Sequence, residues 1–144
     1  MDDDDLTYRG TVYPWHCDHV GHMNVMWYVG KFDEATWNLF RRIGVTASYL
    51  REQRRGMAAV DQHIQYKREL HAGDTVSVRS RILELHDRKI RFRHEMRNGE
   101  TGELAAVTTL VGVHIDTVAR KACPFPQEIA ARAREQLGAG DEPA

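Results

Sequence analysis

Residues that could carry out chemistry are concentrated in one short stretch of the chain. A carboxylate in this stretch, Asp18, could activate water as a general base, or could attack an acyl group directly and form an anhydride. Gly21 would let a substrate approach the backbone closely. The whole cluster consists of His16, Cys17, Asp18, His19, Gly21, His22 and Asn24.

A helix is predicted directly after this cluster, from about Asn24 to Ile43, and it adds a second chemical group. The first N–H groups of a helix have no partner within it and carry positive character, so they can hold an anion or a developing oxyanion. Asp18 and the helix start could therefore act on opposite sides of one carbonyl group. The apolar face that predicts the helix is formed by Val25, Tyr28, Val29, Phe32, Thr36, Leu39, Phe40 and Ile43.

A metal site is a second interpretation of the cluster. His16, His19 and His22 follow an H-x-x-H-x-x-H pattern. Residues three apart share a face only within a helix, and Gly21 and Pro14 argue against a continuous one. Zinc sites also commonly draw ligands from two separated segments, and no second pair such as C-x-x-C is present. We therefore predict no metal.

Two further interpretations stay open at this point. Cys17 could be a nucleophile with His16 or His22 as its base, although such pairs usually meet in space rather than along the chain. Asp18 could also be an ordinary cap or turn residue before the helix.

The remaining pattern is mostly β. It predicts a largely antiparallel sheet, because short turns join the strands, and one face of that sheet needs the long helix as its cover. The layout is α+β, and open sheet edges favour a homodimer. Strands are expected at 7–15, 57–70, 75–85, 89–96 and 104–115, a turn at 72–74, a hairpin at Asn98-Gly99, and a second helix at 127–137.

Composition describes an ordinary globular chain. Its 144 residues are 42% hydrophobic and 28% charged with a net charge of −1, which argues against a nucleic-acid binder. No signal peptide, membrane span or cysteine framework is visible, so we expect a cytoplasmic protein. The expected organisation is an acidic disordered tail at 1–6, one domain at 7–137 and a C-terminal tail at 138–144.

The motif D-x-x-G-H-x-N-x-x-x-Y resembles the signature of hotdog-fold acyl-CoA thioesterases of the 4-hydroxybenzoyl-CoA thioesterase-like family. It is formed here by Asp18, Gly21, His22, Asn24 and Tyr28. The likeness covers roughly residues 8–137 and includes Tyr66-Lys67-Arg68-Glu69-Leu70 with Gly73-Asp74, and Val113-His114-Ile115-Asp116 with Arg120-Lys121.

The resemblance implies a hotdog fold, in which an antiparallel sheet wraps around one long central helix. It also implies a homodimer or dimer of dimers with the site at the subunit interface. Asp18 would be the catalytic carboxylate, supported by Gly21, His22 and Asn24, while N–H groups at the helix start polarise the thioester carbonyl. No metal or organic cofactor is implied.

Candidate substrate contacts are of two kinds, those for the acyl group and those for the CoA phosphates. His16 and Val25 depart from the residues that many relatives carry beside the acyl group, so they bear on substrate identity. Basic residues at strand ends could bind the CoA phosphates. The acyl candidates are Trp15, His16, Val25, Trp27 and Tyr28, and the phosphate candidates are Arg88, Lys89, Arg120 and Lys121.

The predicted function is hydrolysis of an acyl-CoA to the free acid and CoA. One alternative is a non-catalytic hotdog module that binds acyl-CoA or an acyl carrier. A second is a hotdog enoyl-CoA hydratase or dehydratase, but those resemble sequences with a longer Asp-to-His spacing and an N-P-x-H context, which this chain lacks.

Overall fold

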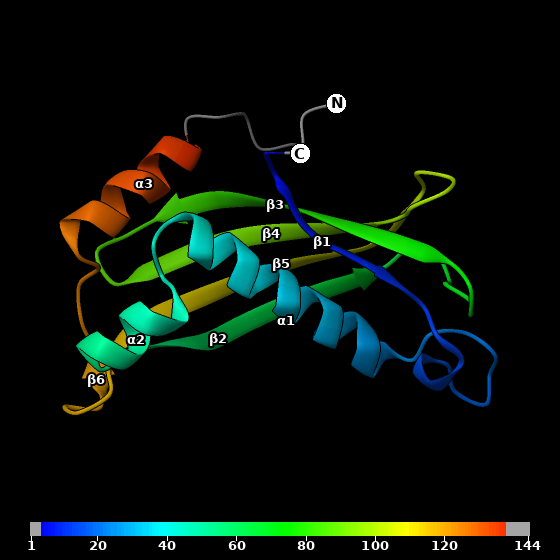
Figure 1. Cartoon of the computed structure of the whole chain (residues 1–144), viewed down its shortest axis with the longest axis horizontal. Coiled ribbons are helices and arrows are strands. Elements are labelled where there is room, and N and C mark those ends of the chain that lie inside the picture. The colour runs from blue at the N-terminus through cyan, green and yellow to red at the C-terminus, as the bar shows by residue number, and fades with distance from the viewer. Residues whose placement is uncertain (1–3, 138–144) are drawn as a thin grey trace. The chain divides into compact units, whose positions relative to one another are not determined.

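The computed structural model describes residues 4–137 (Figure 1). In chain order the elements are β1 (Leu6–Thr11), the 3₁₀ helix η1 (Pro14–His16), α1 (Val25–Arg42), α2 (Ala47–Gln53), β2 (Arg55–Tyr66), β3 (Thr75–Leu85), β4 (Lys89–Asn98), β5 (Leu104–Asp116), β6 (Lys121–Ala122) and α3 (Gln127–Leu137). Among these residues, none of the helices combines the length and the apolarity that crossing a membrane would need.

The long helix α1 agrees with the sequence pattern at both ends. Asn24 precedes its first residue, and Gly44 follows its last turn in a left-handed conformation with φ of +95°. The N–H group of Gly44 donates to the carbonyl oxygen of Arg41 at 3.1 Å, and that of Val45 donates to Phe40 at 2.9 Å. These bonds satisfy carbonyl groups that a helix end leaves open, which is why the helix stops here.

Several strand predictions need correction. β1 ends at Thr11 rather than at residue 15, because Pro14 begins the 3₁₀ helix η1. β2 covers Arg55–Tyr66 rather than residues 57–70. The Asn98-Gly99 hairpin exists, but its loop is longer than two residues, since Asn98 N–H donates to the carbonyl oxygen of Glu103 at 2.9 Å.

The sheet has the strand order β1-β3-β4-β5-β2, and β6 pairs with β5 (Figure 1). β1 pairs with β3 antiparallel, with Gly10 opposite Val76. We expected the strand now seen as β2 to continue through a short turn into β3. It lies next to β5 instead, so β1 and β2 are the two edges of this sheet.

The described residues form two compact units. The first unit takes in residues 4–38, 64–80 and 94–108. Its core combines apolar residues of α1 with residues of the strands and of the segment before the helix. The buried members of this core are Val12, Met23, Tyr28, Phe32, Ala35, Leu70, Val76, Val78, Met96, Ala105 and Ala106.

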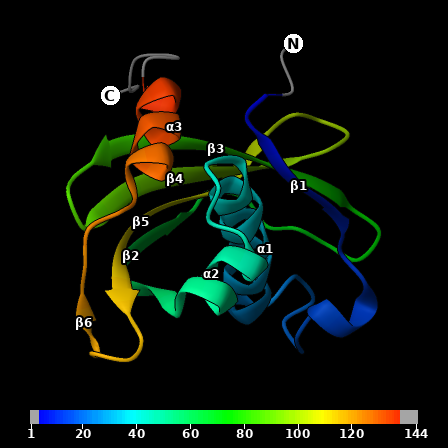
Figure 2. The same ribbon diagram turned by 60° about the vertical axis from the view of Figure 1, so that its left-hand side comes forward.

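The second unit takes in residues 39–63, 81–93 and 109–137, and it contains α2 and α3, drawn in teal and orange in Figure 2. It has a core of its own, to which α3 contributes Ile129, Ala130 and Ala133. The rest of that core consists of Leu39, Phe40, Ile43, Val45, Ile82, Ile90, Phe92, Leu110 and Phe125.

The predicted boundaries are only partly covered by the structure. Residues 1–3 of the expected acidic tail and the expected C-terminal tail at 138–144 lie outside the described residues. Within the expected tail, Asp5 is bound: its carbonyl oxygen accepts the N–H group of Ser80 at 2.8 Å, and its carboxylate pairs with Arg79. Leu6 already belongs to β1. The single domain at 7–137 stays a prediction.

Candidate functional site

The predicted cluster folds into a small hairpin of the first unit. Cys17 and Met23 form an antiparallel bridge, and Asp18 N–H donates to the carbonyl oxygen of His22 at 3.2 Å. Gly21 N–H returns to the carbonyl oxygen of Asp18 at 3.0 Å, and Gly21 has φ of +99°. Glycine tolerates this left-handed conformation, so Gly21 closes the turn rather than starting the helix.

The Asp18 carboxylate is held by two hydrogen bonds. Its Oδ2 accepts the side-chain amide of Asn24 at 2.8 Å, and its Oδ1 accepts the N–H group of Val20 at 2.9 Å. The hydrogen bond from Asn24, followed by that from Val20, lowers the pKa of Asp18 below its usual value. The half-buried carboxylate is therefore charged at neutral pH, which is the form that a base or a nucleophile requires.

Asn24 joins this carboxylate to the helix. While its Nδ2 binds Asp18, its Oδ1 accepts the N–H group of Met26 at 2.9 Å, so the side chain also caps α1. Its own N–H group donates to the carbonyl oxygen of His16 at 2.9 Å. One amide thus fixes the position of Asp18 relative to the first turn of α1.

The N–H group of Val25 is an open donor at the start of α1. Met26 N–H is used by the Asn24 side chain, and Trp27 N–H donates to the carbonyl oxygen of Asn24 at 3.0 Å. Val25 N–H has no hydrogen-bond partner among residues 4–137. Val25 as a whole residue is 54% exposed, and it lies at the helix end that carries a partial positive charge.

A hollow of about 340 Å³ lies at this end of the first unit. Tyr28, which is buried, lies with its ring centroid 5.1 Å from that of Tyr66, and the two rings meet at 82°. The Tyr28 hydroxyl donates to the carbonyl oxygen of Arg68 at 3.2 Å. The hollow is lined by His22, Met23, Val25, Tyr28, Tyr66, Lys67, Arg68 and Glu69.

His22 connects the hairpin with the segment after β2. Its Nε2 is 3.4 Å from Oε2 of Glu69, and the other oxygen of Glu69 is 3.8 Å from Nε2 of His71. His71 is in turn held by Asp74, whose carboxylate accepts the His71 N–H group at 2.8 Å. Sequence reasoning had not assigned Tyr66 or Glu69 to the site, and the only signal was their place in a stretch that resembles the family.

His16 and Trp27 pack against each other. His16 is 8% exposed, its Nδ1 accepts the N–H group of Tyr13 at 3.0 Å, and its ring centroid is 4.5 Å from that of Trp27. Burial and, secondarily, Lys31 lower the pKa of His16, so the ring is neutral. Trp15 is 66% exposed and stacks on Tyr13 at 4.6 Å. Acyl contacts for these residues stay predictions.

The four candidates for the CoA phosphates belong to the second unit. Arg88 Nε lies 3.6 Å from Oδ2 of Asp87, Arg120 occupies a turn with φ of +60°, and Lys121 begins β6. Their phosphate assignment, like that of Lys89, stays a prediction.

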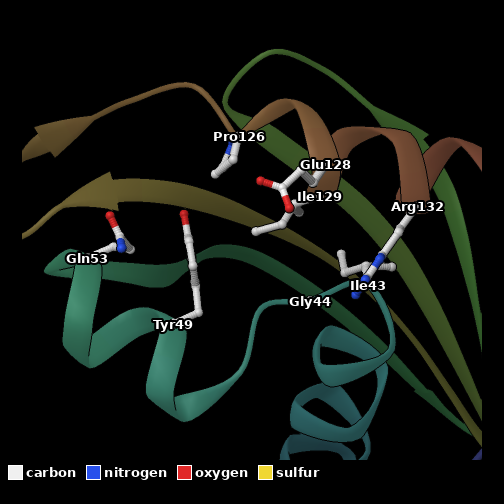
Figure 3. A pocket seen from close by; sticks show the side chains of 8 residues that line it. All are labelled: Ile43, Gly44, Tyr49, Gln53, Pro126, Glu128, Ile129 and Arg132. Atoms are coloured by element: carbon white, nitrogen blue, oxygen red, sulfur yellow. The ribbon is translucent and has the colours of Figure 1, made fainter.

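Within residues 4–137, no three His, Cys, Asp or Glu side chains converge so that they could hold a metal ion. A second hollow, of about 320 Å³, lies in the second unit between α2 and α3, with Tyr49, Gln53, Glu128 and Arg132 as its polar lining (Figure 3). None of the residues that the sequence assigned to chemistry lines it.

A family model described as the thioesterase-like superfamily matches residues 12–133. The chain is 32% identical, over 125 residues, to an L-carnitine dehydrogenase/betainyl-CoA thioesterase of Agrobacterium fabrum, covering 87% of this chain but only 25% of that protein. It is 27% identical over 127 residues to a betainyl-CoA thioesterase of Pseudomonas aeruginosa, covering 88% of this chain and 79% of that one.

Solved structures agree with the fold. A hypothetical protein from Staphylococcus aureus, solved in complex with CoA, superimposes with a TM-score of 0.90, covering 96% of this chain and 88% of that one at 18% identity. At this identity the likeness concerns the fold alone. It confirms the predicted α+β class with an antiparallel sheet and a long helix.

Proposed function

The chain belongs to the thioesterase-like superfamily, and we propose that it hydrolyses an acyl-CoA to the free acid and CoA with Asp18 as the catalytic carboxylate. One observation carries the proposal. The charged carboxylate of Asp18 and the open N–H group of Val25 are linked through Asn24, which binds Asp18 with one end of its amide and caps α1 with the other. A base in the hairpin and an oxyanion donor at the first residue of α1 are thereby held in a fixed relation to each other.

In the general-base form of the reaction, Asp18 takes a proton from water as the water oxygen attacks the thioester carbonyl carbon. The carbonyl oxygen becomes negative, and Val25 N–H donates to it. When the tetrahedral intermediate collapses, the carbon–sulfur bond breaks, and the CoA thiolate leaves and is protonated. Asn24 orients Asp18, and its hydrogen bond favours the charged form in which Asp18 begins the reaction.

In the nucleophilic form, a carboxylate oxygen of Asp18 attacks the carbonyl carbon and expels the CoA thiolate, which leaves a mixed anhydride on Asp18. Water then hydrolyses the anhydride. Hydrolysis in ¹⁸O-labelled water under single-turnover conditions tests for this form. Attack of water on the protein carbonyl of the anhydride leaves label in Asp18, whereas the general-base form labels only the released acid.

The other predicted site residues have supporting roles in this proposal. Gly21 closes the turn that presents Asp18, and His22 stands between Asp18 and Glu69. The working protein is a homodimer or a dimer of dimers, and neither a metal nor an organic cofactor takes part. The CoA phosphates bind basic side chains, and the candidates for this contact are Arg88, Lys89, Arg120 and Lys121.

The names of the relatives bear on the acyl group. The names of both relatives described above include betainyl-CoA thioesterase, and each match covers most of this chain. Because the chain spans only a quarter of the Agrobacterium protein, the dehydrogenase activity in that protein's name is not transferred here. Betainyl-CoA therefore stands first in the panel of substrates to be tried.

The experiment is an assay of the purified protein on a panel of acyl-CoA esters with a free-thiol readout. We expect release of CoA from at least one ester with multiple turnovers. Tight binding of an ester without release of thiol would instead indicate the non-catalytic binding module, and addition of water to an enoyl-CoA without thioester cleavage would indicate a hydratase. Either result would contradict the proposal.

A further inference from the structure

We propose that the hollow next to Asp18 selects acyl groups that carry a quaternary ammonium charge, with Tyr66 and Glu69 as the specificity-determining residues. The inference rests on the proposed thioesterase function and adds a chemical class of substrate to it. Two independent features of the hollow, its aromatic walls and its carboxylate, support the same kind of ligand.

The aromatic walls are the rings of Tyr28 and Tyr66. They meet nearly at a right angle, 82°, with their centroids 5.1 Å apart, and both line the hollow. A methylated ammonium group is apolar on its surface but positively charged, so it is attracted to the negative faces of aromatic rings, and aromatic cages are the common receptors for it. Tyr66 is 48% exposed, which leaves ring surface available to a ligand.

Glu69 adds the negative charge. Its side chain is 64% exposed and lines the same hollow, and its contacts with His22 and His71, at 3.4 and 3.8 Å, are long. A cation in the hollow would therefore meet a carboxylate that is not tightly engaged by a permanent charge. The attraction between unit charges at such a partly exposed site is modest but sufficient to discriminate between substrates.

The Glu69 carboxylate also acts electrostatically on Tyr28, one of the two aromatic walls. The pKa of Tyr28 is raised to about 12. Burial contributes most, the neighbouring Tyr66 and Glu69 follow, and Asp74 adds to the effect. The negative field that resists ionisation of Tyr28 would favour a bound cation. Two side chains with a permanent positive charge also line the hollow. Arg68 is paired with Glu103 at 3.5 Å, whereas Lys67 is exposed and would repel a bound cation.

The hollow is also placed suitably for the reaction. His22 lines it and shares a backbone hydrogen bond with Asp18, and Val25, whose N–H group is the proposed oxyanion donor, lines it too. In betainyl-CoA only one methylene group separates the carbonyl carbon from the trimethylammonium nitrogen. A carbonyl at Val25 N–H would therefore leave the cation within the same hollow.

The test compares two substrates of the same shape and different charge. Betainyl-CoA carries a trimethylammonium group where tert-butylacetyl-CoA carries a neutral tert-butyl group. For each protein variant, the ratio of kcat/KM for the charged ester to that for the neutral ester is measured. We expect wild type to prefer the charged ester on the order of tenfold or more.

Three variants locate the preference. In Glu69→Gln and in Tyr66→Leu the ratio should fall several-fold toward one, whereas Tyr66→Phe, which keeps the ring, should hold most of it. Glu100→Gln is the matched control, because Glu100 is an exposed glutamate of the first unit that does not line the hollow. Effects on the chemical step alone cancel in the ratio.

The measured ratios distinguish the inference from the proposed function. A wild-type ratio near one, with both esters hydrolysed, would overturn the inference and leave the proposed function intact. A strong preference that survives both Glu69→Gln and Tyr66→Leu would overturn the assignment of these residues. Absence of hydrolysis of either ester, together with every other member of the panel, would remove the proposed function and this inference with it.

Discussion

At the scale of single residues, the side chain of Asn24 has two separable tasks. Its Nδ2 donates to Asp18, which lowers the pKa of that carboxyl, and its Oδ1 caps α1. Asn24→Ala removes both, so we expect the acidic limb of the pH profile of kcat/KM to move to higher pH. The lost cap should also reduce the free energy of unfolding by about 1 kcal/mol.

Asn24→Asp separates the two tasks. An aspartate at position 24 keeps an oxygen for the cap but places a second negative charge against Asp18. The pKa of Asp18 should therefore rise, while the free energy of unfolding changes little. The pH profiles of both variants and their denaturant unfolding curves give the comparison. An acidic limb that stays at the wild-type pH in both variants would mean that Asp18 is not the group that titrates.

Sequence reasoning reached the residues of the hairpin but not their distant partners. Asp18, Gly21, His22 and Asn24 lie within seven positions of one another, so a local motif could group them. Tyr66 and Glu69 meet them only through tertiary packing, about forty residues further along the chain. The helix face was predicted correctly for Tyr28 and Phe32, whereas Val25 and Val29 are exposed, because periodicity alone cannot tell which turns of a face are covered.

At the scale of secondary-structure elements, His94 of β4 connects α1 to β3. It is fully buried, its Nε2 lies 2.8 Å from Thr36 Oγ1, and its Nδ1 lies 2.5 Å from Ser80 Oγ. A buried histidine is tolerated where its ring nitrogens have hydrogen-bond partners, and both nitrogens of His94 have one. Burial lowers the pKa of His94 from 6.5 to about 3.

This histidine makes stability depend on pH. Between pH 6.5 and about 3, His94 is protonated in the unfolded chain but neutral in the folded one. The free energy of unfolding is therefore highest above this range and decreases as the pH falls through it. Urea unfolding at several pH values should show that the free energy of unfolding decreases more steeply with falling pH in wild type than in His94→Gln. The His94→Gln protein should be less stable overall. His86→Gln, at an exposed histidine, should keep the wild-type slope; equal slopes in all three proteins would contradict the assignment.

At the scale of the whole molecule, β2 is an edge strand whose later residues are largely exposed, with Val60 at 59%. A long open edge is a site for pairing with another chain, which fits the proposed homodimer. Light scattering should give at least twice the chain mass of 16.6 kDa for wild type.

A charge on this edge should weaken the pairing. We expect Val60→Lys to shift the protein toward the monomer, because a buried lysine at an interface loses its hydration. Val118→Lys places the same charge on a turn at a residue that is 65% exposed and should leave the mass unchanged. A monomeric wild type, or a Val60→Lys protein with unchanged mass, would argue against pairing through β2.

The measurement closest to the central claim is the kcat of Asp18→Asn on the best acyl-CoA substrate of the wild type. The change removes the charge of the carboxylate and keeps its size, and the thermal unfolding midpoint serves as the check that the hairpin still folds. We predict a fall in kcat of roughly a hundredfold or more with the fold retained. A folded Asp18→Asn protein with activity within about twofold of wild type would contradict the role of Asp18 as the catalytic carboxylate.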